Sequence, residues 1–274
     1  METLHDVACL GPVGTYSEDA AIRYFGAASR RLLVPSLDAV FGAVESAQSR
    51  NGVVAVENTT EGSVPRTLDL LATTDLKVCG ELTLAIHHAL MSSAAGLGEI
   101  RCVRAHAQAL AQCHEWLCLN VPHARREAVL SNAEGARMAS RDPTSAAIAS
   151  ARSAAQYSVP VMFPDIQDIA INQTRFLILG RHDEAWTENA KTSLIISVEN
   201  EPGTLYKALE PFYRHGVSMS RLESRPSRRG VWEYNFYIDL VGHRSDRPIA
   251  AALEELGRIA TVRMLGSYAA SASA

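Results

Sequence analysis

The feature that most constrains the fold of this chain is a change, along the sequence, in the pattern of predicted strands and helices. Before residue 182, short apolar runs alternate with stretches of helical periodicity. Gly52–Val56 (GVVAV), for example, is apolar and β-branched like a buried strand, and Val64–Leu71 follows it with the spacing of a helix. Strands that alternate with helices predict an α/β domain whose sheets are mostly parallel.

The same reasoning predicts the other elements of this first part. Strands are expected at Val7–Leu10, Leu82–Met91, Cys102–Ala105, Val129–Ser131 and Arg175–Leu179, and helices after Ser17 and at Ser36–Ser49, Ala107–Leu119, Ala133–Ser140 and Thr144–Ser153. His87 and His88 are adjacent on one predicted strand, where neighbouring side chains point to opposite faces. The sequence therefore offers no metal-ligating group, and we expect no metal.

The order of predicted strands and helices changes after a charged segment, residues 182–191, which we interpret as a linker. Beyond it, strands are predicted at Ser193–Glu199, Val217–Arg225, Trp232–Leu240 and Val262–Ser267, and helices at Thr204–His215 and Ile249–Leu256. The third strand alternates large apolar residues with polar ones, as a half-buried strand does. The resulting βαββαβ order predicts a ferredoxin-like domain.

Composition excludes several classes of partner. The formal net charge is −4 and no basic stripe occurs, so we expect no nucleic-acid partner. No stretch approaches the roughly 18 apolar residues that a membrane span needs, and the N-terminus lacks the pattern of a signal peptide. The five cysteines include no CxxC pair, which is typical of reduced thiols. We expect a cytoplasmic protein without a membrane partner, and no further domain before the first strand at Val7.

Polar segments follow several of the predicted strands. Gly14, Thr15, Tyr16 and Ser17 lie where a strand gives way to a helix, and backbone N–H groups at a helix start attract anions. An ordinary capped loop is the alternative. Glu57 and Asn58 follow the strand Gly52–Val56 directly, at the sheet edge where α/β proteins place ligands; a plain polar turn is the alternative.

Two further segments are weaker alone. His106 and Gln112 bound a short helical stretch and could be simple caps or surface groups. Thr174 and Arg175 begin a strand, and an arginine there either pairs with a carboxylate or is an ordinary surface residue.

Taken together, these motifs resemble the prephenate dehydratase family over the entire chain. The resemblance rests on Leu10–Ser17 (LGPVGTYS), Val56–Asn58 with Gly62, Ser63 and Thr67–Leu71 (TLDLL), Glu81 to Leu90, and Asn172 with Thr174–Phe176 (TRF). It implies a catalytic domain at 1–181, two-lobed like a type II periplasmic binding protein, with one lobe at about 1–80 and 166–181 and the other at about 81–165. The implied reaction converts prephenate to phenylpyruvate in L-phenylalanine biosynthesis, with the active site between the lobes and no cofactor.

The resemblance also implies roles for individual residues. Thr174 would hydrogen-bond to the departing hydroxyl, and Arg175 would either attract the anion or support the fold. Asn58 and Gln112 would orient the substrate and Glu57 would help to position them. The substrate-binding set would be Gly14, Thr15, Tyr16, Ser17, Ser63 and Phe176. The chain departs from the family at Ala105, Ala107 and Asn132, where serine, proline and threonine are usual.

The last domain, residues 192–268, resembles an ACT domain. The residues that carry this likeness are Gly203, Thr204, Leu205 and Tyr206 at a helix start, and Glu223, Ser224, Arg225 and Pro226 at a strand end. They imply a phenylalanine site between subunits and a homodimer or homotetramer assembled through the ACT and catalytic domains. Ser218 replaces the usual asparagine, so phenylalanine could inhibit or activate. A plain ferredoxin-like dimerisation domain is the alternative.

Other activities remain open. An arogenate dehydratase would use the aminated substrate, and a relative of the family decarboxylates prephenate without aromatising it. The intact Thr174–Phe176 motif argues against the latter. A non-catalytic sensor of amino acids or aromatic metabolites is a third possibility, and such a sensor need not retain Asn58, Gln112 and Thr174 together.

Overall fold

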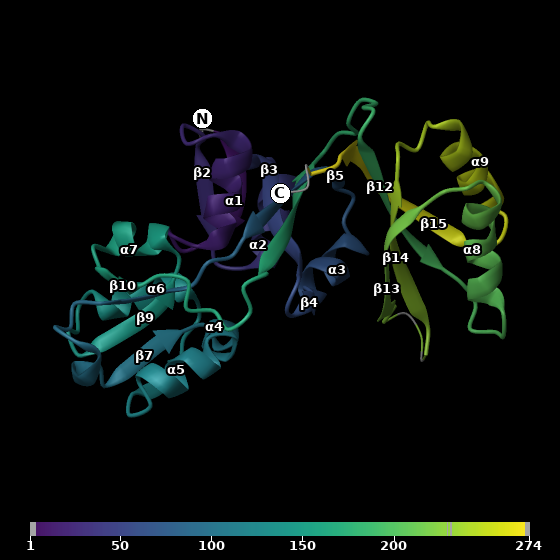
Figure 1. The fold of residues 1–274 in the computed structure, drawn as a ribbon. Helices are drawn as coiled ribbons and strands as arrows, with labels where there is room; N and C mark the ends of the chain where they lie inside the picture. The colour runs from purple at the N-terminus through teal and green to yellow at the C-terminus, as the bar shows by residue number, and fades with distance from the viewer. Residues whose placement is uncertain (1–3, 229, 231, 272–274) are drawn as a thin grey trace. The chain divides into compact units, whose positions relative to one another are not determined.

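The computed structural model describes residues 4–228, 230 and 232–271. The first three residues of the predicted catalytic domain lie outside this range. The chain divides into two compact units, Met1–Thr67 with Thr83–Phe176, and Leu68–Leu82 with Leu177–Ala274 (Figure 1). No helix among the described residues is long and apolar enough to cross a membrane.

The first sheet of the chain confirms the predicted alternation of strands and helices. Its strands are β1 (His5–Leu10), β2 (Arg31–Val34), β3 (Ser49–Asn58), β4 (Gly62–Ser63), β5 (Lys77–Ala85) and β11 (Gln173–Gly180), in the order β2-β1-β3-β11-β5 with β4 on β3. Strand β1 is parallel to both of its neighbours. Helices α1 (Tyr16–Phe25), α2 (Leu37–Glu45) and α3 (Pro65–Leu71) connect these strands. The crossovers leave the strand ends and helix starts on one edge of the sheet.

A second sheet follows in the order β10-β6-β9-β7-β8. Its strands are β6 (Ala89–Ser92), β7 (Cys102–Ala105), β8 (Arg125–Ala128), β9 (Ser145–Ala149) and β10 (Val161–Phe163). The accompanying helices are the 3-10 turn η1 (Leu97–Glu99), α4 (Ala107–Gln112), α5 (His114–Asn120), α6 (Asn132–Ala139) and α7 (Ala151–Tyr157). Leu90, Val103 and Ile148 are fully buried in its core.

Several predicted elements in this region were wrong. Thr144–Ser153 is not a helix, because Ser145–Ala149 forms the central strand β9, and all five of its residues are buried. The predicted strand Leu82–Met91 is interrupted after Ala85, where the chain leaves the first sheet for the second. The strand predicted at Val129–Ser131 lies earlier, at β8, and Ser131 instead caps α6. Cys113 divides the helix predicted at Ala107–Leu119 into α4 and α5.

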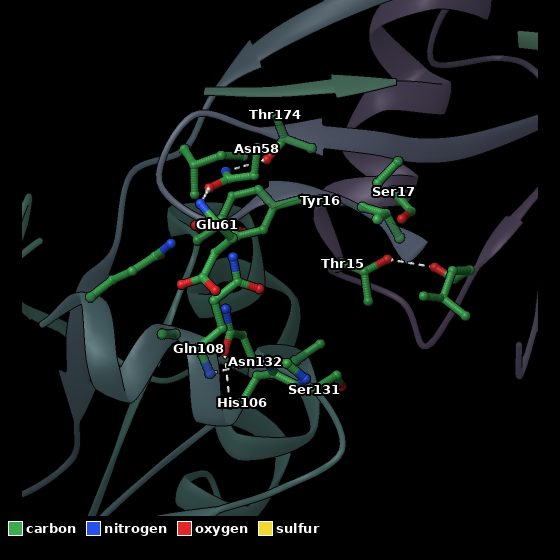
Figure 2. A pocket seen from close by; sticks show the side chains of 18 of the residues that line it. Thr15, Tyr16, Ser17, Asn58, Glu61, His106, Gln108, Ser131, Asn132 and Thr174 are labelled. Carbon is green, nitrogen blue, oxygen red and sulfur yellow. Dashed lines mark hydrogen bonds between the residues drawn. The ribbon is translucent and has the colours of Figure 1, made fainter. Parts of the chain in front are cut away.

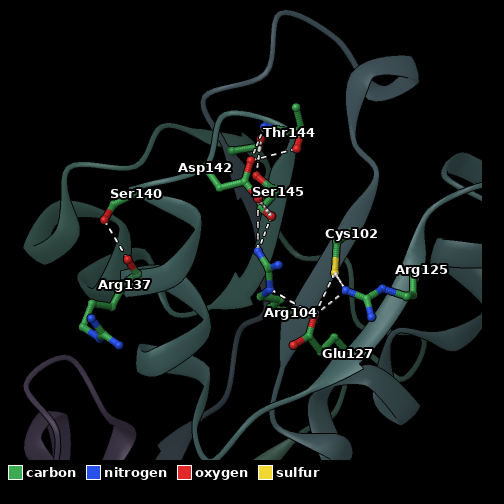
Figure 3. Close-up of polar contacts among 10 residues, drawn as sticks. Cys102, Arg104, Arg125, Glu127, Arg137, Ser140, Asp142, Thr144 and Ser145 are labelled. Atoms are coloured by element: carbon green, nitrogen blue, oxygen red, sulfur yellow. Dashed lines mark hydrogen bonds and ion pairs between the residues drawn. The ribbon is translucent and has the colours of Figure 1, made fainter.

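A network around Arg104 joins the strands of the second sheet (Figure 3). Its guanidinium lies 3.2 Å from Glu127 and 3.4 Å from Asp142, and it also donates to Ser145. Hydrogen bonds from Ser145 and Thr144 lower the pKa of Asp142 to about 2. The turn before β9 is thereby fastened to β7 and β8.

The second unit contains the predicted βαββαβ order. Its elements are β12 (Ala190–Ser197), α8 (Thr204–Arg214), β13 (Met219–Pro226), β14 (Tyr234–Val241), α9 (Arg247–Leu256) and β15 (Thr261–Ala269). The strands form an antiparallel sheet in the order β13-β14-β12-β15, and α8 and α9 lie side by side on one face (Figure 1). Leu194 and Ile238 of the sheet and Phe212 of α8 are fully buried in one core cluster.

Candidate active site

A cavity of about 580 Å³ opens in the first unit at the carboxyl ends of strands from both sheets. Asn58 ends β3 and Leu10 ends β1, whereas His106 and Ser150 directly follow β7 and β9. Figure 2 shows side chains from these segments turned toward a common space. Open α/β sheets bind ligands at this edge, so the cavity is the candidate active site.

Helix N-termini surround this cavity. The N-cap residues Thr15 of α1, His106 of α4, Ser131 of α6 and Ser150 of α7 all line it, as does Pro65, the first residue of α3. The first N–H groups of a helix have no partner within the helix, and they carry a partial positive charge. The arrangement therefore suits an anion.

The loop before α1 is organised mainly by its own bonds. Glu18 accepts from the Gly14 N–H at 2.7 Å, and the Thr15 hydroxyl donates to the Leu10 carbonyl at 2.7 Å while accepting from the Glu18 N–H. The predicted donors Gly14 and Thr15 are thus already engaged. Among the described bonds, none uses the backbone N–H groups of Tyr16 and Ser17, which remain available to a ligand.

Gly14 has a structural requirement of its own. Its φ is +89°, and a Cβ at this position would lie 3.0 Å from the Ser153 hydroxyl. That hydroxyl donates to the Gly14 carbonyl at 2.6 Å, and the Tyr157 hydroxyl donates to the Val13 carbonyl at 2.9 Å. The glycine thus lets α7 and the α1 loop approach each other closely.

Cationic side chains are missing from the described lining of the cavity, which contains no lysine or arginine. Glu61 is the carboxylate among these residues, and it points into the space (Figure 2). Burial lowers the pKa of His88, which favours a neutral ring. An anion bound here would consequently depend on backbone N–H groups and on neutral donors.

Asn58 holds Thr174 in a defined orientation. The Asn58 Oδ1 accepts from the backbone N–H groups of Thr60 and Glu61 and from the Thr60 hydroxyl, which fixes the opposite end of the amide as the donor. The Nδ2 group donates to Thr174 Oγ1 at 2.9 Å, and also to Asn172 Oδ1 and the Gln173 carbonyl. Because Thr174 accepts in this bond, its own proton is free, among the described bonds, to point into the cavity.

Gln112 is engaged at both ends of its amide. Because Thr60 donates its proton to Asn58, it must accept from Gln112 Nε2, at 2.6 Å. Gln112 Oε1 then accepts from Asn172 Nδ2 at 3.1 Å and from His88 Nε2 at 2.8 Å. This places the proton of the neutral His88 on Nε2, and leaves Nδ1 facing the Tyr16 hydroxyl at 3.2 Å.

The structure brings together most of the predicted site residues. Thr174, Asn58 and Gln112 line the cavity, together with Gly14, Thr15, Tyr16, Ser17, Ser63 and Phe176. Glu57 and Arg175 do not line it; they approach each other at 3.9 Å on the neighbouring strands β3 and β11. Four residues for which the sequence predicts no role also line the cavity: Glu61, His88, Gln108 and Asn132.

The second unit has a cavity of about 390 Å³ at the start of α8. Gly203, Thr204, Leu205 and Tyr206, which the sequence predicts to bind phenylalanine, line it, and so does Trp232. The predicted residues Glu223, Ser224, Arg225 and Pro226 lie outside its lining, on the edge strand β13. Arg225 donates instead to Asp69 on α3, at 2.9 and 3.1 Å.

Comparisons with known proteins agree with this architecture. The family model described as prephenate dehydratase matches residues 7–184, and the model described as ACT domain matches residues 192–258. A bifunctional chorismate mutase/prephenate dehydratase from Neisseria gonorrhoeae is 47% identical over 266 residues, or 96% of this chain and 74% of the relative.

Two solved structures are similar over almost the whole chain. A prephenate dehydratase in complex with L-Phe from Arthrobacter aurescens has a TM-score of 0.90 at 32% identity, covering 97% of this chain and 90% of that one. A structure named GqqA, described as a novel type of quorum quenching acylase, has a TM-score of 0.86 at 28% identity, covering 98% of each chain.

The two sheets and the cavity at their strand ends define a two-lobed α/β domain of the type II periplasmic-binding-protein kind, followed by an ACT domain. The match over residues 7–184 spans more than half of the sequence. The chain belongs to the prephenate dehydratase family. Because GqqA shares the fold under a different described activity, the reaction must be argued from the site.

Proposed function

We propose that this chain converts prephenate to phenylpyruvate by decarboxylating dehydration, as a step of L-phenylalanine biosynthesis, with Thr174 at the reaction centre. The observation that carries the proposal is the direction of the Asn58–Thr174 bond, in which Thr174 accepts. The Thr174 proton is thereby left to donate to a leaving oxygen in the cavity. Family membership supports the choice of substrate.

The reaction needs positioning more than a strong catalyst. The ring C–O bond breaks, and the hydroxyl takes up a proton and leaves as water. The ring carboxylate leaves as carbon dioxide, and the electrons of its C–C bond complete the aromatic ring. Among the described bonds, none uses the N–H groups of Asn132 and Ala133 at the start of α6, as is also the case for Tyr16 and Ser17 of α1. These groups would hold the substrate carboxylates, while Thr174 stabilises the departing oxygen.

Asn58 is proposed to keep Thr174 in its accepting orientation, and Gln112 to hold Asn58 through Thr60. Since both ends of the Gln112 amide are engaged, its proposed role is positioning rather than direct contact with the substrate. Glu57 and Arg175 are proposed to support the fold by joining β3 to β11 beside the site. This choice follows from their pairing outside the cavity lining.

An assay of phenylpyruvate formation from prephenate tests the proposal. We expect Thr174→Ala to lower kcat by about 10²–10³, the usual effect of removing one donor to a developing negative charge. Thr174→Ser retains a hydroxyl and should retain most of the activity. Near-normal turnover by Thr174→Ala would remove Thr174 from the mechanism. If the unaltered protein shows no turnover, the result would favour the alternative function, a non-catalytic sensor of amino acids or aromatic metabolites.

One observation favours a second candidate, dehydration of arogenate. This substrate carries an ammonium group, and Glu61 places a carboxylate in the cavity lining. Competition between prephenate and arogenate in one reaction mixture distinguishes the two activities through the ratio of kcat/KM. A preference for prephenate would leave Glu61 without this recognition role.

We propose that phenylalanine controls the enzyme from the cavity at Gly203–Tyr206. The L-Phe complex of the Arthrobacter aurescens relative supports the choice of effector. Helix α3 begins at Pro65 in the lining of the active-site cavity and passes into the second unit after Thr67, where its residue Asp69 pairs with Arg225 and Arg228. Asp69→Asn should therefore weaken the response of kcat to phenylalanine while phenylalanine still binds; an unchanged response would exclude this route.

The remaining proposals concern organisation. We propose the catalytic domain at 1–181, the linker at 182–191 and the ACT domain at 192–268, with one lobe near 1–80 plus 166–181 and the other near 81–165. The limit between residues 80 and 81 falls within β5. A homodimer or homotetramer is supported by the edge strand β13, which exposes Leu222. A cytoplasmic location is supported by the free state of all five cysteines.

A further inference from the structure

A group of possible metal ligands lies in the second unit, outside both cavities. Cys79 belongs to β5, and His182 and Glu184 belong to the segment between β11 and β12. One ligand atom from each of the three lies within 4.8 Å of the other two. His182 Nε2 and Glu184 Oε1 are already 2.9 Å apart, and Cys79 Sγ lies 3.2 Å from the His182 carbonyl oxygen.

The chemistry of these side chains selects the kind of ion. A thiolate, an imidazole and a carboxylate together match the ligands of Zn²⁺, which binds them at about 2.0–2.3 Å in a tetrahedron. Hard ions such as Mg²⁺ and Ca²⁺ prefer oxygen ligands. We propose that Cys79, His182 and Glu184 bind one Zn²⁺ ion, with water as the fourth ligand.

A glycine makes the approach of these ligands possible. Gly180 is the last residue of β11, and a Cβ there would lie 2.7 Å from Cys79 Sγ and 3.4 Å from His182 Nδ1. Any side chain at this position would enter the space between the sulfur and the imidazole. The absence of a Cβ thus leaves a space bounded by two of the three ligands.

The segment that carries His182 and Glu184 is held in place at other points. Asp183 pairs with Arg244 at 3.2 Å, and the Trp186 indole donates to Asp246 at 2.8 Å. These contacts fasten the segment to the loop between β14 and α9. Little rearrangement is needed to bind an ion. Ligands at the zinc distance in a tetrahedron lie about 3.3–3.7 Å apart, so His182 and Glu184, now at 2.9 Å, need only separate slightly, and a pair at the 4.8 Å limit need only approach by about 1 Å.

The site is open on one side. The side chains of His182 and Glu184 are 62% and 38% exposed, whereas Cys79 is buried. An ion can therefore enter from solvent and a water can complete its coordination. Burial raises the pKa of the Cys79 thiol to about 12, so the metal-free protein carries a thiol. Zinc binding forms the S–Zn bond and releases the thiol proton to solvent.

Metal binding to the full chain tests the proposal directly. The protein is treated with a chelator, dialysed, and titrated with ZnCl₂ by calorimetry and with CoCl₂ by absorption. We expect one Zn²⁺ per chain and a thiolate-to-cobalt charge-transfer band. Cys79→Ser should abolish the band, and His182→Gln and Glu184→Gln should each weaken zinc binding by at least about tenfold. His182 is exposed, so its variant should fold even if Cys79→Ser does not.

Two control variants make the result specific. Glu188→Gln alters an exposed carboxylate of the same segment that is not one of the three proposed ligands, and it should change zinc affinity less than threefold. Cys118 and His114, whose Sγ and Nε2 atoms lie 3.6 Å apart, are a second thiol and imidazole that could compete for zinc. Zinc affinity weaker than about 1 µM, or loss of the cobalt band in Cys118→Ser instead of Cys79→Ser, would overturn the assignment.

Discussion

The orientation of the Asn58 amide can be tested by replacing its donor group, the amide nitrogen, with an acceptor. In Asn58→Asp, an oxygen replaces the Nδ2 group that donates to Asn172 Oδ1, the Gln173 carbonyl and Thr174 Oγ1. The Gln173 carbonyl cannot donate, and the Asn172 amide group already donates to Gln112, so Thr174 is the partner that can turn and donate instead. Its proton would then point at residue 58 and away from the substrate.

The structure sets the expected magnitudes. Two acceptors, Asn172 Oδ1 and the Gln173 carbonyl, lose their donor at a residue that is only 7% exposed. Each loss costs about 1–3 kcal/mol, and the three donors retained by the other oxygen offset part of this. We expect a loss of about 3 kcal/mol in the free energy of unfolding, or a Tm lower by about 6–12 °C. The kcat should fall by about 10²–10³.

A matched control exists on the same strand. Asn51 also lies on β3, and its Nδ2 donates to the Asp6 carbonyl at 3.1 Å, away from the cavity. Asn51→Asp should cost about 1 kcal/mol of stability and leave kcat within twofold. Steady-state kinetics and thermal unfolding are measured for both variants. If folded Asn58→Asp retains kcat within threefold of the unaltered protein, the direction assigned to the Asn58–Thr174 bond is incorrect.

Three further changes test the electrostatics of the first unit. Glu61→Gln should lower KM for prephenate by roughly two- to fivefold at low ionic strength, less so at high salt, and should raise KM if arogenate is the substrate. Burial lowers the pKa of His88 from its usual value of 6.5. Below pH 6.5, the unfolded chain therefore binds a proton at this histidine that the folded protein does not bind, and the folded protein loses stability as the pH falls. His88→Gln should therefore reduce the fall in unfolding free energy between pH 7.5 and 5.5, by at most about 1.4 kcal/mol per pH unit, as denaturant titrations at each pH would show. Asp142 has its pKa lowered from 3.8 to about 2, so its stabilising effect is complete above pH 3.8 and is lost as the pH falls toward about 2. Because its side chain is 40% exposed, Asp142→Asn should lower the free energy of unfolding by only about 1 kcal/mol at pH 6. In denaturant titrations, this difference from the unaltered protein should vanish near pH 2.

The errors in the predicted fold have a common physical origin. Ser145–Ala149 is rich in alanine, and its side chains are buried on both faces of the sheet, so it shows neither the period of an amphipathic helix nor that of a half-buried strand. The strands β3 and β14 were predictable because β-branched residues or strict alternation marked them. The break after Ala85 depends on a change of sheet, which no local pattern records.

The site was predictable to the extent that its residues follow strands. Asn58 and Thr174 were identified because they lie at strand ends in recognisable motifs. The bonds of Gln112 to His88 and Thr60 were not, because those residues lie 24 and 52 positions away along the chain. The same separation conceals the group formed by Cys79 and His182, which are 103 positions apart.

The absence of cationic side chains from the described cavity lining bears on how a substrate dianion would be held. The backbone N–H groups at the start of α1 belong to the lobe of the first sheet, and those at the start of α6 belong to the lobe of the second. Helix-terminal attraction decays within about one helical turn, so a dianion gains both sets of contacts only where its two carboxylates reach both helix starts. An effector that alters the distance between these helix starts would change substrate binding, and the substrate would change effector binding by the same factor.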